Sequence, residues 1–208
     1  MTANVAICTP VRDQVNTQFA YSLANLTSYL ERNNTTHSVY FENGSVLPKQ
    51  RNDLVQTVLE RSSHTHIMWL DSDMVFPRHT VNSLLKHNRD VIACTYSTRH
   101  KPYASVAFTN SEDLTQRLDA TTGLHNVWAV GMGCVLVNCE VYRMLPKPWY
   151  MFEYNYANQD FLGEDLYFCK QLEEYDIECT VDIDLSKQVT HVGSKEFKLE
   201  DTHVQNSV

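Results

Sequence analysis

The stretch HIMWLDSDMVFP, residues 66–77, contains the pattern that decides the fold of this chain. Residues 66–70 form an apolar run of strand length that leads directly into Asp71 and Asp73. A buried strand that ends in acidic residues is typical of an open α/β sheet, where ligands bind beyond the carboxyl ends of the strands. Two carboxylates between apolar flanks repel one another unless a cation or hydrogen-bond donors compensate. We interpret residues 71–73 as a candidate cation site, with a solvated or helix-capping turn as the alternative.

Strand-like and helix-like segments alternate on both sides of this stretch, which indicates crossover connections and a mostly parallel sheet. Strands are expected at 5–8, 36–41, 66–70 and 90–96, and helices at 15–31, 51–62 and from Pro77 to 85. After residue 96 one helix is expected at 163–175, among strand-like runs at 103–108, 126–130, 134–138, 179–185 and 188–192. We therefore predict an α/β fold with one domain over residues 1–197. It comprises an α/β half at 1–96, a more antiparallel half at 97–197, and then a polar tail at 198–208.

The composition fits a globular protein that folds by its hydrophobic core. The chain has 208 residues, 43% of them hydrophobic, and a domain of this size buries roughly 70% of its unfolded surface. The formal charge of −8 argues against nonspecific electrostatic binding of a polyphosphate over a broad surface. The six cysteines lack C-x-x-C spacing and several stand in apolar runs, so we expect reduced core residues. No signal peptide and no apolar window of membrane-spanning length is visible, so we expect a cytoplasmic protein without stable membrane insertion.

The residues that follow the predicted strands are the first candidates for a site. These residues are Thr9, Pro10 and Arg12 after the first strand, Asp71, Ser72 and Asp73 after the third, and His191 after the last. An Asp-x-Asp turn can offer carboxylate oxygens to one hard cation that also holds substrate phosphates. His64 and His66 precede a strand and have no further ligands nearby, so we predict that they are surface residues.

Six segments, in order along the chain, resemble the glycosyltransferases of the GT-A fold, especially small family-2-like and phage-encoded members. The segments are TPVR (9–12), QRNDLV (50–55), WLDSDMVFP (69–77), VGMGCVLV (130–137), GEDLYFCKQL (163–172) and THVG (190–193). The resemblance spans about residues 3–193. It implies a mixed sheet flanked by helices, with 1–96 as the nucleotide-binding half and 97–197 as the acceptor-binding half. The implied activity is metal-dependent transfer of a hexosyl or pentosyl group from a nucleotide-sugar donor, most often UDP-linked.

The resemblance also implies roles for residues of the donor site. Asp71, Asp73 and His191 correspond to ligands of Mn²⁺ or Mg²⁺, and Ser72 fills the variable middle position. The expected nucleotide-sugar site comprises Thr9, Pro10, Arg12, Arg51, Asp71, Ser72, Asp73, Gly131 and Gly133. Arg51, expected at a helix start, could reach a phosphate, or it could be a solvated charge. The two glycines interrupt a strand pattern, which suggests a bulge or a close backbone approach.

Catalysis and acceptor binding are expected around the helix at 163–175. Acidic residues such as Glu164 and Asp165 can simply complement a helix dipole, but the resemblance places the catalytic carboxylate at Asp165. It would act as the base of an inverting transfer, with Glu164 binding acceptor hydroxyls. Trp149 and Tyr154 belong to an aromatic segment that could stack on the acceptor, although core packing explains such residues equally well.

The acceptor and two other functions stay open at this point. A hydroxymethylated base in phage-type DNA and a glycan are equally good acceptors, with protein third, and Arg99, His100 and Lys101 are where DNA would be attracted. A haloacid-dehalogenase-like phosphatase with Asp71 as nucleophile is one alternative, although two β/α units precede the motif. A non-catalytic sugar-binding module on a transferase fold is the other.

Overall fold

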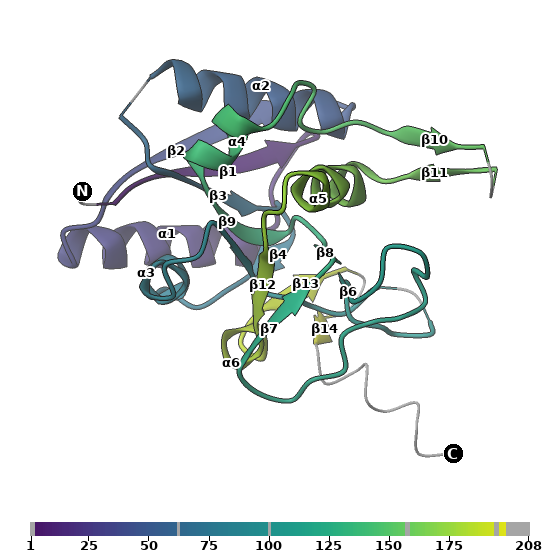
Figure 1. Cartoon of the computed structure of the whole chain (residues 1–208). Helices are drawn as coiled ribbons and strands as arrows, with labels where there is room; N and C mark the ends of the chain where they lie inside the picture. The colour runs from purple at the N-terminus through teal and green to yellow at the C-terminus, as the bar shows by residue number, and fades with distance from the viewer. Residues whose placement is uncertain (1–2, 62, 100, 157–158, 194–195, 199–208) are drawn as a thin grey trace.

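The computed structural model describes residues 3–61, 63–99, 101–156, 159–193 and 196–198 (Figure 1). Its centre is a seven-stranded sheet in the order β2-β1-β3-β9-β5-β12-β7. Five strands run in one direction: β1 (Asn4–Val11), β2 (Thr36–Asn43), β3 (His66–Leu70), β5 (Val91–Ala93) and β12 (Cys179–Asp182). Two strands run against them: β7 (Leu124–Val127) and β9 (Cys134–Asn138). The predicted mixed α/β fold is confirmed.

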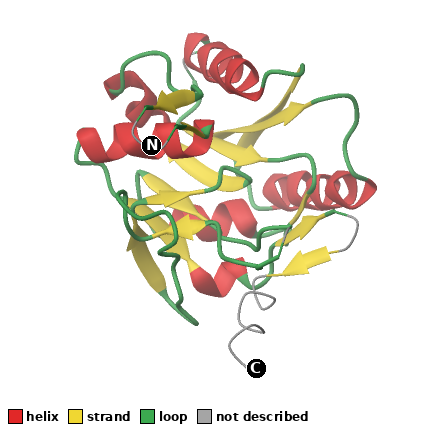
Figure 2. Cartoon of the chain, turned by 90° about the vertical axis from the view of Figure 1, so that its right-hand side faces the viewer, coloured by secondary structure: helices red, strands yellow, loops and turns green. Residues whose placement is uncertain are grey.

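Helices cover both faces of this sheet (Figure 2). One face packs against α1 (Thr17–Arg32) and α3 (Thr80–Lys86), and the other against α2 (Leu47–Glu60), α4 (Cys139–Met144) and α5 (Glu164–Glu174). Strand β1 shows how the sequence builds two cores, because side chains alternate between the faces of a strand. Val5 and Ile7 enter the core beneath α1, whereas Ala6 and Cys8 enter the core beneath α2.

Short strands form separate, smaller sheets that bring distant segments of the chain together. Strand β13 (Thr190–Val192) pairs with β4 (Met74–Val75) and with β14 (Glu196–Lys198). Because His191 pairs with Met74, the last predicted site residue lies beside the Asp-x-Asp turn. Strand β6 (Ala107–Phe108) pairs with β8 (Ala129–Val130), and β10 (Glu153–Asn155) forms a hairpin with β11 (Asp160–Leu162) that leads into α5 (Figure 1).

Several predicted boundaries are wrong, for local reasons. Strand β1 continues to Val11, α2 begins at Leu47 rather than at Arg51, and α3 begins at Thr80 rather than at Pro77. The run 179–185 is half strand and half helix, because Asp182 accepts a hydrogen bond from the Leu185 N–H at 2.9 Å and caps α6 (Ile183–Ser186). The strand expected at 103–108 reduces to β6, and the one at 188–192 to β13.

The remaining expectations concern the two halves, the cysteines and the tail. Strand β9, from the second half, lies between β3 and β5 of the first half, so residues 1–96 and 97–197 share one sheet. All six cysteines are buried and free, as expected. The tail beyond Lys198 lies outside the described residues. Within the described ranges, no helix has the length and apolarity that crossing a membrane requires.

Candidate functional site

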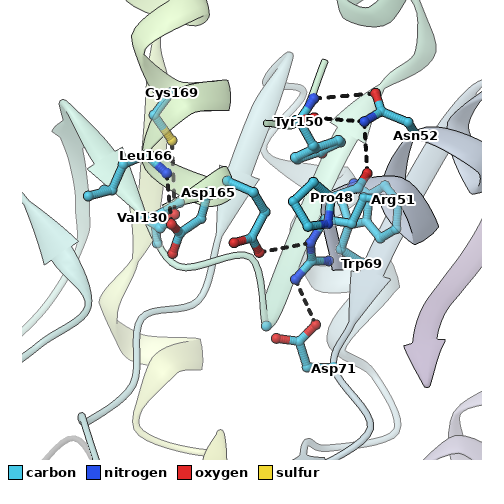
Figure 3. Close-up of polar contacts among 12 residues, drawn as sticks. Pro48, Arg51, Asn52, Trp69, Asp71, Val130, Tyr150, Asp165, Leu166 and Cys169 are labelled. Atoms are coloured by element: carbon cyan, nitrogen blue, oxygen red, sulfur yellow. Dashed lines mark hydrogen bonds and ion pairs between the residues drawn. The ribbon is translucent and has the colours of Figure 1, made fainter. Parts of the chain in front are cut away.

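A buried arginine joins the two acidic motifs of the sequence (Figure 3). The Arg51 Nη2 atom lies 2.9 Å from Asp71 Oδ1, and its Nε atom lies 3.3 Å from Glu164 Oε1. Its side chain is 1% exposed, and its Cζ atom lies 5.2 Å from the Trp69 ring centroid. Burial opposes the charged form, but Asp71 and Glu164 outweigh it and raise the pKa of Arg51. Arg51 is therefore a permanent cation between two carboxylates, neither at a helix start nor solvated.

The second aspartate of the turn belongs to a different cluster. Asp73 Oδ2 lies 2.8 Å from Arg99 Nη1 and 3.3 Å from His191 Nε2. Burial favours the neutral acid, but His191 and Arg99 outweigh it and lower the pKa of Asp73. The carboxylate is therefore ionised at neutral pH. Arg99, singled out for attraction of DNA, instead pairs with the turn, while Lys101 is exposed and His100 lies outside the described residues.

The predicted metal ligands fit a shared cation site only in part. Asp73 and His191 lie side by side, and the His191 Nδ1 atom is buried without a hydrogen-bond partner among the described groups. Asp71 instead faces Arg51, and no three His, Cys, Asp or Glu side chains of the described ranges are placed to hold an ion by themselves. Mg²⁺-type sites commonly use one or two carboxylates together with substrate phosphates. The donor set therefore suits a cation that is completed by a bound diphosphate.

The acidic pair begins α5, as predicted. Glu164 is buried against Arg51, whereas Asp165 is half-buried and its Oδ1 atom accepts a hydrogen bond from the Leu166 N–H at 2.8 Å. Burial, followed by the charge of Glu164, raises the pKa of Asp165 to about 6. A carboxylate with a pKa close to neutral is well matched to general-base work. Its catalytic role stays a prediction.

The two glycines have a structural reason that the sequence did not reveal. Tyr96 follows β5, and its Oη atom accepts a hydrogen bond from the Gly133 N–H at 3.0 Å. A Cβ atom on Gly133 would lie 2.8 Å from Tyr96 Cζ, and one on Gly131 would lie 2.9 Å from Tyr96 Oη. The close approach is therefore to a tyrosine ring. Tyr96 was expected inside the strand at 90–96, whereas β5 ends at Ala93, so inspection of the residues after each predicted strand missed it.

The other predicted donor residues are placed less favourably. Thr9 and Pro10 lie inside β1 and are buried, and the Arg12 side chain is 83% exposed, with Asp13 3.6 Å away. No contact joins these three side chains to the acidic groups in the described part of the chain. The Ser72 carbonyl accepts a hydrogen bond from the Asn16 N–H at 3.0 Å, which ties the turn to the start of α1.

Aromatic and histidine predictions separate into core and surface. Trp149 is 3% exposed and its Nε1 donates to the Tyr142 carbonyl, so it is a core residue rather than an acceptor contact. Tyr154 lies in the hairpin and is 40% exposed. The surface prediction for His64 is wrong, because its ring packs on Tyr40 and is 6% exposed, while His66 is half-buried.

No family model and no curated protein matches the sequence. Several solved structures match the fold. Protein A197 from STIV has a TM-score of 0.61 and 15% identity, over 91% of this chain and 86% of that one. A mutant of Drosophila β-1,4-galactosyltransferase 7, in complex with manganese, UDP-Gal and xylobiose, has a TM-score of 0.56 and 14% identity, over 92% of this chain and 71% of that one.

A third structure, of GalNAc-T7 with UDP, GalNAc and Mn²⁺, has a TM-score of 0.54 and 11% identity. The match covers 91% of this chain but 43% of GalNAc-T7, so the chain spans less than half of that protein. At these identities the likeness concerns the fold. The chain has the GT-A glycosyltransferase fold that its motifs predicted.

Proposed function

We propose that this protein is a metal-dependent glycosyltransferase that moves a sugar from a UDP-linked donor to an acceptor hydroxyl. The observation that carries the proposal is the joining of the Asp-x-Asp turn to the acidic pair of α5 through one buried arginine, Arg51. The GT-A fold supports the proposal, because two of the matching structures contain UDP or UDP-Gal together with manganese.

The donor side uses the turn and its partners. Asp73 and His191, with Asp71 nearby, would hold Mn²⁺ or Mg²⁺, which when bound offsets the charge of a diphosphate. Arg99 is half-exposed, so replacing its ion pair with Asp73 by a contact to a ligand costs little free energy. A guanidinium group also matches the geometry of phosphate oxygens. We assign Arg99 to the donor diphosphate.

The acceptor side uses Glu164 and Asp165. Asp165 accepts the proton of the acceptor hydroxyl while that oxygen forms a bond to the anomeric carbon. The bond between that carbon and the diphosphate oxygen breaks, and the configuration inverts. Glu164 gives one oxygen to Arg51, and we assign the other to an acceptor hydroxyl.

Thermal unfolding with Mn²⁺ and UDP tests the donor site. We expect both together to raise the midpoint of wild type, and Asp73→Ala to abolish this increase. Asp53→Ala, which removes an exposed carboxylate on α2, is the matched control and should keep it. The proposal fails if wild type shows no joint effect of metal and nucleotide.

Product analysis tests the chemistry. Asp165→Asn should still bind donor but transfer no sugar to hydroxymethylated DNA or glycans, and the wild-type product should have inverted configuration by NMR. Phosphatase activity that needs no nucleotide and disappears in Asp71→Asn would instead favour the phosphatase. Glycan binding with no transfer from any donor would favour the binding module.

A further inference from the structure

We propose that a pocket beside the β10–β11 hairpin binds a neutral oligosaccharide that serves as the acceptor. This hairpin pocket has a volume of about 420 Å³ and is lined by Trp128, Glu153, Tyr154, Tyr156, Lys170 and Glu173, among others. The inference rests on the proposed function and names the acceptor class that it leaves open.

The pocket and the proposed base share one helix. Asp165 lies in the first turn of α5, and Lys170 follows five residues later, about 7.5 Å along the axis and about 140° around it. Leu162, the last residue of the hairpin, also lines the pocket and is separated from α5 by Gly163 alone. The pocket and Asp165 therefore lie beside different faces of the same end of α5, so an acceptor of several sugar units is needed to extend from one to the other.

Two tyrosines of the pocket lining, Tyr154 and Tyr156, have exposed rings, and Tyr154 also contacts the neighbouring Phe161. Tyr154 is 40% exposed, and its ring makes edge-to-face contacts with two others. Its ring centroid lies 4.9 Å from that of Tyr156 and 5.0 Å from that of Phe161. Phe161 is 65% exposed and Tyr156 is 86% exposed. Clustered exposed apolar groups of this kind mark interaction sites. Such rings match the C–H faces of sugar rings, which are apolar on the face and polar at the rim.

The polar groups of the pocket are fixed and carry little net charge. Lys170 Nζ lies 2.8 Å from Glu153 Oε2, and the Trp128 Nε1 donates to Glu173 Oε2 at 2.8 Å. Two carboxylates and one ammonium give the lining a net charge of −1. Carboxylates with remaining lone pairs accept hydrogen bonds from hydroxyls. This combination suits a polyhydroxylated, uncharged ligand.

The same charges argue against a nucleic-acid acceptor in this pocket. Sites for single-stranded nucleic acid combine stacking rings with a positively charged groove, and duplex binding likewise depends on cations at phosphates. The described lining has stacking rings, but Glu153 neutralises its one cation, Lys170. A phosphodiester chain would meet net repulsion, whereas a glycan would not.

Fluorescence titration in the absence of donor tests the inference directly. Of the three tryptophans, Trp69 and Trp149 are buried and Trp128 lines the pocket, so a bound ligand should change the emission of Trp128. The probes are linear hexasaccharides of glucose, xylose, mannose and N-acetylglucosamine, together with hydroxymethylated single- and double-stranded DNA. We expect saturable binding of at least one hexasaccharide and weaker binding of both DNA probes.

Variants localise the binding. Tyr154→Ala should weaken binding of the hexasaccharide roughly tenfold, which corresponds to a loss of about 1.4 kcal/mol. Tyr156→Ala, at a highly exposed position that the fold does not need, should weaken it as well. Tyr21→Ala removes a 73% exposed tyrosine on α1 and should leave the affinity unchanged.

The outcomes separate this inference from the proposed function. Hexasaccharide binding that is lost in both hairpin variants supports the pocket, even if UDP and Mn²⁺ show no joint effect. The pocket proposal is overturned if no hexasaccharide binds, if binding survives both substitutions, or if DNA binds more tightly than every glycan. Metal-dependent UDP binding would still stand in each of those cases.

Discussion

Replacement of Arg51 by methionine tests whether one buried cation holds the two acidic motifs together. Methionine keeps much of the length and apolar bulk of the side chain, so the change removes mainly the charge and its two ion pairs. Both carboxylates then lose their nearest cation. The Glu164 side chain is 10% exposed and that of Asp71 is 29% exposed, so water replaces the lost contact only in part.

The expected cost follows from these exposures. Breaking a buried ion pair by removing one partner costs about 3–5 kcal/mol. Because Asp71 is partly solvated, we expect about 3 kcal/mol at pH 7, at the lower end of that range. For a chain of this length such a loss lowers the unfolding midpoint by roughly 6–12 °C.

The stability deficit of Arg51→Met should also depend on pH, in a direction that the carboxylates determine. Arg51 lowers the pKa of Asp165, so without the guanidinium this pKa rises further in the folded state, and that state binds more protons than the unfolded chain. The deficit of Arg51→Met relative to wild type should therefore shrink as the pH falls from 7 to 5. Urea unfolding at both pH values measures it, and adding Glu164→Gln should recover part of the loss. A deficit below 1 kcal/mol, or one that does not change with pH, would refute the reasoning.

Three further predictions concern the surroundings of this arginine. Asp165→Asn should raise the free energy of unfolding at pH 8 but not at pH 4. Because the pKa of Asp165 is about 6 in the folded state and 3.8 ordinarily, the wild type loses stability as the pH rises from 3.8 to 6. Urea titrations that show Asp165→Asn to be destabilising at pH 8 would contradict this. Gly133→Ala should lower the free energy of unfolding by roughly 1–3 kcal/mol, because the new Cβ overpacks against Tyr96. Adding Tyr96→Phe should recover only part of this loss, because the ring atom Cζ still lies 2.8 Å from the new Cβ. Asn52→Ala should lower the unfolding midpoint clearly, because its amide bonds the Tyr150 carbonyl at 2.7 Å and the Trp149 N–H at 3.0 Å. Calorimetry measures the midpoint, and Asn25→Ala, which removes one exposed hydrogen bond, is the control. Equal changes of the unfolding midpoint in Asn52→Ala and Asn25→Ala would contradict the argument.

Hydrophobic periodicity was sufficient to predict the helices that bury one apolar stripe and the strands that consist of one apolar run. It failed where a polar contact decides the boundary, as at Asp182, whose side chain turns a strand-like sequence into a helix cap. It also misplaced the start of α2, because Leu47 and Pro48 precede the polar residues that conceal the helical pattern. The position of an element could thus be predicted better than its ends.

The candidate site was predictable as a set of carboxylates but not as a set of pairs. The order of motifs brought Asp71, Asp73, Glu164 and Asp165 to one edge of the sheet. Which cation each carboxylate meets depends on contacts between residues far apart in the chain. Arg51 is 113 residues from Glu164, and Arg99 is 26 residues from Asp73. Burial of Arg51 and Trp149 likewise depends on packing that no local pattern specifies.

The place of β9 between β3 and β5 has a consequence for biosynthesis. When a ribosome has released the chain as far as β5, both β3 and β5 still lack the neighbour that separates them, and each presents an open edge. Such edges invite pairing with other chains until residues 134–138 emerge. The sheet closes only by contacts of long sequence separation, which are slow to form. A chain cut after residue 96 should therefore aggregate rather than fold, so residues 1–96 are expected to need residues 97–197 in order to fold.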